Sequence, residues 1–300
     1  MPVMILWSKG EVLPNMRMKD TVKGSDPMLT HAHAPGTTLI VDEIPGRIVG
    51  DDDWPPGRVL HLGPHGETLW ETSALKMPYD AVPLSDGGYL VNIIRARAVW
   101  HIAPDGQAVR EWPVGGYPCS LQLLPNGHFL VAGWDDDIPG FVREFSTDGQ
   151  CVWSIEKLCW PWCAQRLGGG TTLIADAGTG RVYEVTQDGS EIWGIGGLGP
   201  ERPALFDALG PVYCQRLDNG NTLVSIRGLS RVVELNSHYE TVWEVGPDRV
   251  ATQYSAIRLS NGNTLIADQG HNRVIEIDRE QHIVWERGGF GYPAKAYRWD

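Results

Sequence analysis

The chain has 300 residues, of which 37 are acidic and 25 basic, and its formal net charge at pH 7 is −12. This negative average repels a phosphate backbone and argues against nucleic acid as a partner. The 36 glycines and 21 prolines occur without low-complexity tracts, which is typical of a folded chain with many turns.

The first residues read MPVMILWSKGEVLP and contain neither a basic segment nor a long apolar core. They do not resemble a secretion signal, and no apolar run in the chain is long enough to span a bilayer. The five cysteines are an odd number and include no CxxC pair. We therefore expect reduced thiols, a cytoplasmic location and no membrane partner.

A tight-turn glycine followed by a short apolar run recurs six times along the chain. The glycines lie 40 to 51 residues apart, and each copy ends near a tryptophan. A period near 40 residues with these marks is typical of propeller blades. In chain order the pairs are Gly36 and Trp70, Gly87 and Trp112, Gly127 and Trp153, Gly170 and Trp193, Gly220 and Trp243, and Gly262 and Trp285.

Each copy is predicted to form four strands, which in the last copy are YSAIRL, NTLIAD, RVIEID and HIVWER. Turn dipeptides such as NG and DG accept the positive φ of tight hairpins and fix the strand register. We predict an all-β protein, a six-bladed β-propeller of four-stranded antiparallel blades that forms one domain over residues 1–300. The tryptophans are expected on the outermost strands, where they cover the seams between blades.

The ends of the chain are expected to close the ring. MILWSKG resembles an outer strand and GYPAKAYRWD the start of an inner one, and their meeting would remove exposed strand edges. A seventh, degenerate blade built from both termini is the alternative. The terminal segments are 1–27 and 290–300, and the predicted blades span about 28–73, 77–116, 117–158, 160–197, 211–246 and 252–289.

The sequence NGNTLIAD, followed by NRVIEID and IVWE, resembles the repeats of NHL-type propellers and of the arylsulfotransferase-like group. The resemblance covers most of the chain and implies a propeller fold. The relatives include lyases, hydrolases, transferases and pure binding scaffolds, so the resemblance implies no single activity.

Two long segments, residues 42–57 and 197–212, are expected on the face of the ring opposite the tight turns. The first and fourth blades lie across the ring from each other, so these segments would meet over the mouth of the central channel. Variable loops on a rigid scaffold usually carry the functional site.

The candidate catalytic residues depart from the repeat pattern. The first copy carries THAHA where others carry QRL or AIRL, which places His31 and His33 on one side of an expected inner strand. These imidazoles suit acid/base chemistry or metal binding, and hydrogen bonding within a blade seam is the alternative. Arg95 and Arg227 are expected to clamp an anionic group or to pair with nearby aspartates. His271 lies in the equivalent loop of the last copy.

Candidate substrate-binding residues gather at the same mouth. Asp135 begins an acidic run that suits a cation or a basic substrate, and a solvated loop is the alternative. An apolar wall beside polar groups is the usual make-up of a small-molecule pocket, although packing of the blade entrances is the alternative. The aromatic residues predicted for this wall are Trp160, Trp162, Tyr213 and Tyr254, and Tyr79 and Trp134 are further candidate substrate-binding residues.

Three further patterns recur between copies. Asp176 and Arg181 reappear as Asp268 and Arg273, and each pair is expected to tie the second and third strands of its blade. Cysteines near the starts of three inner strands, Cys119, Cys163 and Cys214, are expected to be buried fillers, with a thiol metal cluster as the alternative. Glutamates that share one register, and that we expect to be solvated, are Glu144, Glu184, Glu234 and Glu276.

Together these features favour an enzyme with a small-molecule substrate, a pocket at the channel mouth, and elimination, hydrolysis or cyclisation as its reaction. The alternative is a non-catalytic propeller that binds a protein or a ligand through its loop face. The sequence contains no nucleotide-binding loop and does not identify a cofactor, and a divalent metal is an option that it does not require.

Overall fold

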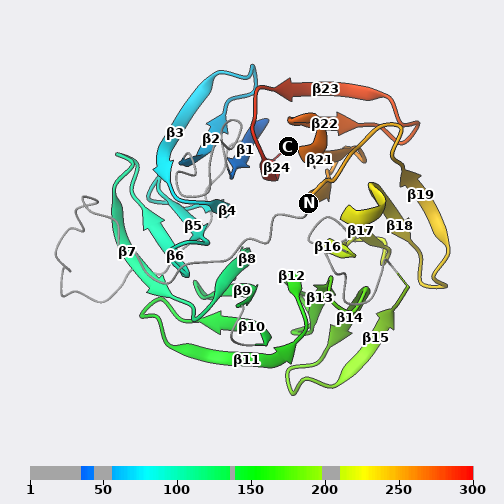
Figure 1. The fold of residues 1–300 in the computed structure, drawn as a ribbon, viewed down its shortest axis with the longest axis horizontal. Helices are drawn as coiled ribbons and strands as arrows, with labels where there is room; N and C mark the ends of the chain where they lie inside the picture. Colours follow the sequence, from blue (N-terminus) through cyan, green and yellow to red (C-terminus); the bar gives the residue numbers. More distant parts are fainter. Residues whose placement is uncertain (1–34, 44–55, 136–138, 198–209, 300) are drawn as a thin grey trace, which may run out of the picture.

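The structure, a computed structural model, describes residues 35–43, 56–135, 139–197 and 210–299. Twenty-four strands form six four-stranded antiparallel sheets arranged as a ring (Figure 1). The described residues also include two short 3-10 helices, η2 (Arg227–Leu229) and η3 (Gln269–His271), neither of them long enough to cross a membrane. The predicted all-β, six-bladed propeller is confirmed, and the seven-bladed alternative is wrong.

The six blades are numbered in the order of the chain, and their strands run from the innermost to the outermost. Blade 1 contains β24 (Pro293–Trp299), β1 (Thr37–Asp42), β2 (Gly57–Leu62) and β3 (Thr68–Leu75). Blade 2 contains β4 (Pro78–Pro83), β5 (Tyr89–Ile93), β6 (Ala98–Ile102) and β7 (Ala108–Pro113). Blade 3 contains β8 (Tyr117–Leu123), β9 (Phe129–Trp134), β10 (Gly140–Phe145) and β11 (Cys151–Leu158).

The other three blades follow the same order from the inside of the ring to the outside. Blade 4 contains β12 (Pro161–Arg166), β13 (Thr172–Asp176), β14 (Arg181–Val185) and β15 (Glu191–Ile195). Blade 5 contains β16 (Pro211–Arg216), β17 (Thr222–Ile226), β18 (Arg231–Leu235) and β19 (Thr241–Val245). Blade 6 contains β20 (Ser255–Arg258), β21 (Thr264–Asp268), β22 (Arg273–Ile277) and β23 (Ile283–Gly288).

Blade 1 combines strands that lie far apart in the chain. β24 pairs antiparallel with β1, with Leu39 opposite Tyr297 and Val41 opposite Lys295. The C-terminal segment thus supplies the innermost strand of blade 1, a place that the sequence analysis gave to the segment with His31 and His33, which lies outside the described residues. Because β24 covers the inner edge of β1, it removes an open strand edge and holds the ring closed.

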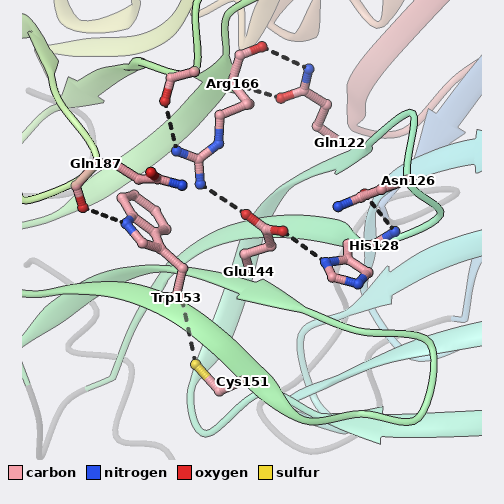
Figure 2. Close-up of polar contacts among 9 residues, drawn as sticks. Gln122, Asn126, His128, Glu144, Cys151, Trp153, Arg166 and Gln187 are labelled. Carbon is pink, nitrogen blue, oxygen red and sulfur yellow. Dashed lines mark hydrogen bonds and ion pairs between the residues drawn. The ribbon is translucent and has the colours of Figure 1, made fainter.

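The outer-strand tryptophans join neighbouring blades, as the repeats predict. Trp153 of blade 3 donates from Nε1 to the carbonyl oxygen of Gln187 in blade 4 at 2.7 Å (Figure 2). These tryptophan side chains therefore stabilise the contacts between neighbouring blades. The same contact, at 3.0 Å, recurs from Trp70 to Pro104, from Trp112 to Thr147 and from Trp243 to Arg279.

The expectation that the repeated glutamates are solvated is wrong. Glu144 of β10 accepts a hydrogen bond from Arg166 Nη2 at 3.0 Å, and the Arg166 guanidinium lies 4.0 Å from the centroid of the Trp153 ring (Figure 2). Since Arg166 ends β12 of the next blade, the ion pair crosses a seam. Equivalent triads are Glu184, Arg216 and Trp193; Glu234, Arg258 and Trp243; and Glu276, Arg298 and Trp285.

The aspartate–arginine ties within blades are correct for blade 6 and wrong for blade 4. Arg273 Nε donates to Asp268 Oδ2 at 2.8 Å and joins β21 to β22. In blade 4, Arg181 pairs instead with Glu191 at 2.7 Å. Asp176 there accepts hydrogen bonds from backbone N–H groups just before β12, so this carboxylate fixes the entry of the chain into the blade.

Candidate functional site

The inner strands of the six blades surround the centre of the ring (Figure 1). Because neighbouring strands are antiparallel, the start of each inner strand lies on the same face as the loop between the second and third strands of its blade. We call this face the mouth. The tight turns between the first and second strands lie on the opposite face.

Four of the candidate substrate-binding aromatics meet at the mouth. The ring centroid of Tyr79 lies 5.6 Å from that of Trp162 and 5.5 Å from that of Tyr254. Trp134 adds its ring at 6.3 Å from Trp162. Tyr79 is 2% exposed and Trp162 is 5% exposed, so these side chains pack against one another across the mouth. We call these four residues the aromatic cluster.

A buried arginine and a buried glutamate border the aromatic cluster. Arg227 begins η2, and its guanidinium lies 4.6 Å from the centroid of the Tyr254 ring. Its Nη2 donates to Oε1 of Gln269 at 3.0 Å. Glu43 directly follows β1, and its backbone N–H donates to the carbonyl oxygen of Tyr292 at 2.9 Å. The end of β1 thus places an acidic group, and the start of η2 a basic group, near the same aromatic rings.

Burial raises the pKa of Glu43 to about 7, although the positive charge of Arg227 opposes the shift and the negative charge of Asp42 adds to it. Within the described ranges, the Glu43 carboxyl forms no hydrogen bond and no ion pair. Both of its protonation states are therefore populated at neutral pH, which suits proton transfer. The sequence analysis missed this residue because Glu43 stands outside the repeat pattern, at the start of the long loop of the first copy.

Asp135 pairs with Arg97, an arginine that the sequence analysis did not consider. Arg97 contacts both oxygens of the Asp135 carboxylate, at 2.9 and 3.2 Å, and also donates to the hydroxyl of Tyr117 at 3.1 Å. Asp135 is buried, whereas Arg95 is exposed on the loop between β5 and β6. The pair ties blade 2 to blade 3 beside the aromatic cluster, because a bidentate arginine–carboxylate contact fixes both side chains.

The predicted histidines lie in different settings. His271 Nδ1 lies 2.8 Å from Oδ2 of Asp268, the same oxygen that accepts from Arg273. His271 is half-exposed, so it extends the tie within blade 6 toward solvent. His31 and His33 lie outside the described residues. Among the residues that the structure describes, no three His, Cys, Asp or Glu side chains are grouped so that they would hold a metal ion.

A second level lies one residue further along the inner strands, toward the tight-turn face. It contains a cavity of about 210 Å³, which we call the inner chamber. Tyr213, predicted for the wall at the mouth, lines this chamber. The other polar side chains around it include Asp80, Ser120, Cys163, Cys214 and Tyr297.

A larger depression of about 520 Å³ lies over blade 4, but its polar groups are already engaged. Arg181 and Glu191 pair with each other there, and Asp176 accepts backbone hydrogen bonds. No set of groups converges in it as Glu43 and Arg227 do at the mouth, so the mouth is the stronger candidate site.

No family model and no curated protein matches the chain. Among solved structures, a protein of unknown function from Bacteroides caccae is 20% identical with a TM-score of 0.65, over 88% of this chain and 98% of that chain. A chain of a nidogen/laminin complex is 12% identical with a TM-score of 0.61, over 87% and 97%. A streptogramin B lyase is 14% identical with a TM-score of 0.56, over 86% and 89%.

These similarities extend to the fold and no further. Structures named as an enzyme and as part of a binding complex share the propeller with this chain, so the fold alone does not choose between the two classes of function. The resemblance to NHL-type and arylsulfotransferase-like repeats is accordingly confirmed for the propeller arrangement and not for a particular family.

Proposed function

We propose that the protein is an enzyme that binds a small molecule at the mouth of the ring, with Glu43 as its acid/base group. The observation that carries this proposal is the buried Glu43 carboxyl, with a pKa near 7, beside Arg227 and the aromatic cluster. Enzymes commonly tune a carboxyl group to the working pH by burying it next to a charged partner. The fold is shared with a streptogramin B lyase, which supports an enzymatic reading at the level of fold alone.

The neighbours of Glu43 favour a substrate with a flat apolar part and a carbonyl or anionic group. Tyr254, which is partly exposed, offers an aromatic surface for the apolar part, and the buried rings of Tyr79 and Trp162 pack beside it. The Arg227 guanidinium supplies a positive charge for an anionic group or for a developing oxyanion. A small molecule is therefore the partner that we propose.

Two of the reactions expected from the sequence suit these groups. In an elimination, the Glu43 carboxylate removes a proton from the carbon next to a carbonyl, Arg227 stabilises the negative charge on the carbonyl oxygen, and the leaving group departs from the β-carbon with its electron pair. In a hydrolysis, Glu43 takes a proton from the attacking water instead. Both reactions need the same base and the same positive charge. His31, His33 and Arg95 stay as predicted further groups of this site, and the cytoplasmic location also stays a prediction.

The test is turnover of a panel of aromatic lactones and aromatic β-acyloxy ketones, followed by mass spectrometry between pH 5 and pH 9. The variants are Glu43→Gln and a control, Glu280→Gln, which removes an exposed carboxylate from a turn of blade 6. A general base typically contributes a factor of about 100 to 10,000 to the rate. We expect Glu43→Gln to lose turnover by at least this lower factor and Glu280→Gln to keep the wild-type rate.

The pH dependence separates catalysis by Glu43 from simple loss of binding. Wild-type turnover is expected to rise through pH 7 as the carboxyl ionises. If Glu43→Gln turned over the substrate at the wild-type rate, the assignment of Glu43 as the base would be contradicted. Binding without turnover in both proteins would favour the alternative, a non-catalytic propeller that presents its loop face to a ligand or a protein.

A further inference from the structure

Lys295 is a buried basic side chain in the innermost strand of blade 1. It is the third residue of β24 and is 1% exposed. Among residues 35–43, 56–135, 139–197 and 210–299, it takes part in no hydrogen bond and no ion pair. Its recorded contacts are with aromatic faces, since Nζ lies 4.6 Å from the centroid of the Tyr213 ring and 5.8 Å from that of Tyr79. A buried charge without a hydrogen bond is costly, so such a group usually has a ligand or a role.

The ammonium lies between blades on opposite sides of the ring. Lys295 belongs to blade 1, Tyr79 to blade 2 and Tyr213 to blade 5. Burial raises the pKa of Asp80 and of Cys214, and the positive charge of Lys295 partly opposes both shifts. The pKa of Cys163 is lowered mainly by its hydrogen bond with Cys214, and the charge of Lys295 acts in the same direction. All three line the inner chamber together with Tyr213. Lys295 does not itself line the chamber, and its ammonium lies against the ring of Tyr213, which does.

Asp80 does not neutralise this ammonium by direct contact. Its Oδ1 accepts from the Tyr297 hydroxyl at 2.7 Å and from the Ala81 N–H at 2.9 Å, and its Oδ2 accepts from the Leu121 N–H at 2.8 Å. Three donors thus satisfy the carboxylate, while the described part of the chain provides no hydrogen-bond acceptor for Lys295. Among the described residues, the Asp80 carboxylate therefore has its donors, whereas the Lys295 cation lacks an acceptor.

The chamber has room for such an acceptor. A cavity of about 210 Å³ holds roughly seven waters at about 30 Å³ each, or one organic anion of similar size. The chamber also becomes less enclosed toward the tight-turn face, because Asp80 and Cys163 are buried while Gln122, Gln165 and Tyr297 are partly exposed. A small solute can therefore be expected to approach from the face opposite the mouth.

We propose that the inner chamber is a binding site for a small monocarboxylate, which is attracted by the positive charge of Lys295 beside the ring of Tyr213. The lining of this site contains neither Glu43 nor Arg227 nor any residue of the aromatic cluster, although Tyr79 of that cluster contacts Lys295. The proposal does not depend on the function proposed for the mouth. The hydroxyls of Ser120 and Tyr213 stand in the lining as further hydrogen-bonding groups for the ligand.

Cys163 provides a reporter inside the chamber. Its thiol lines the cavity and donates a weak hydrogen bond to the carbonyl oxygen of Cys214 at 3.6 Å, whereas Cys151 is exposed on β11. Iodoacetate and iodoacetamide both alkylate a thiolate by forming an S–C bond and releasing iodide, and they differ in that only the first is a carboxylate. Peptide mass spectrometry then gives the ratio of the two rates at Cys163, with the ratio at Cys151 in the same molecule as the internal reference.

We expect iodoacetate to be favoured over iodoacetamide at Cys163, relative to Cys151, by at least tenfold. Lys295→Met removes the charge with little change in length and is expected to abolish this preference while leaving the Cys151 ratio unchanged. Asp80→Asn removes a repelling charge and is expected to increase the preference. A ratio at Cys163 equal to that at Cys151 in the wild type, or an unchanged preference in Lys295→Met, would overturn the proposal.

A second measurement needs no variant and covers the case in which Lys295→Met fails to fold. Sodium acetate is titrated into the wild-type protein at constant ionic strength, which is maintained with a sulfonate buffer too bulky for the chamber. Acetate is expected to slow the reaction of iodoacetamide with Cys163 and not with Cys151, and to raise the melting temperature saturably, because a ligand stabilises the state that binds it. If neither reagent labels Cys163, the melting temperature alone decides. Absence of both effects overturns the proposal.

Discussion

Replacing Glu234 by alanine tests whether the ion pairs between blades hold the ring together. Glu234 is 2% exposed and accepts from Arg258 Nη2 at 2.9 Å and from Asn221 Nδ2 at 2.7 Å. It also pairs with Arg279. The substitution leaves the Arg258 side chain, which is 9% exposed, without its carboxylate. Removal of one partner from a buried pair costs about 3–5 kcal/mol, while Arg279 is 41% exposed and adds little because water solvates it.

The expected loss of about 3–5 kcal/mol corresponds to a fall of about 5–8 °C in melting temperature, at an unfolding entropy of about 2.1 cal/mol/K per residue. Scanning calorimetry on wild type, Glu234→Ala and the control Glu244→Ala measures it. Glu244 pairs with Arg231 on the outside of blade 5, where both side chains are more than one third exposed. The control is expected to lose less than about 1 kcal/mol. Equal melting temperatures for the two variants would refute the view that the buried seam pair is structural.

Three further predictions follow from the same contacts. Trp243→Ala is expected to cost about 3–5 kcal/mol in calorimetry, because it removes a buried ring and the hydrogen bond to Arg279; ligand binding should not change, and a loss of binding at an unaltered melting temperature would contradict this. Truncation after residue 292 removes β24 and opens the inner edge of β1, so circular dichroism should show cooperative loss of the fold; a native spectrum would disprove closure by β24. Burial raises the pKa of Glu43 from 4.5 to about 7, so the folded state keeps the proton to a higher pH than the unfolded state does. The free energy of unfolding is therefore expected to fall by about 3 kcal/mol as the pH rises from 4.5 to 7. Urea denaturation should show that Glu43→Gln lacks this dependence on pH, and parallel pH profiles for the two proteins would contradict it.

The propeller could be predicted because the same pattern of strands and turns recurs in all six blades. Glycines with positive φ recur at the tight turns, as at Gly220 and Gly262, and the outer tryptophans mark the end of each copy. The inner strand of blade 1 was harder to place, because β24 and β1 pair although they lie at opposite ends of the described sequence. A signal was present, however, since Arg298 of β24 stands opposite Thr38 as Arg258 of β20 stands opposite Thr264.

The candidate site could be predicted only in part. Tyr79 and Trp162 were expected near each other because both stand at the starts of inner strands, and these starts converge at the mouth. Glu43 and Lys295 were missed because their side chains are buried only in the closed ring, and such burial leaves no pattern in the local sequence. The repeated glutamates were misplaced for the same reason, because each finds its arginine in the following blade, as Glu144 does.

The most direct test of the proposed function is the titration of the Glu43 carboxyl group by carbon-13 NMR, with the signal assigned by its absence from Glu43→Gln. The structure predicts a midpoint near pH 7, because burial disfavours the charged form more than Arg227 favours it. Saturation of the mouth with a substrate or competitive ligand from the turnover panel is expected to shift this midpoint. A midpoint near 4.5, with or without such a ligand, would contradict the role of Glu43 as an acid/base group at neutral pH.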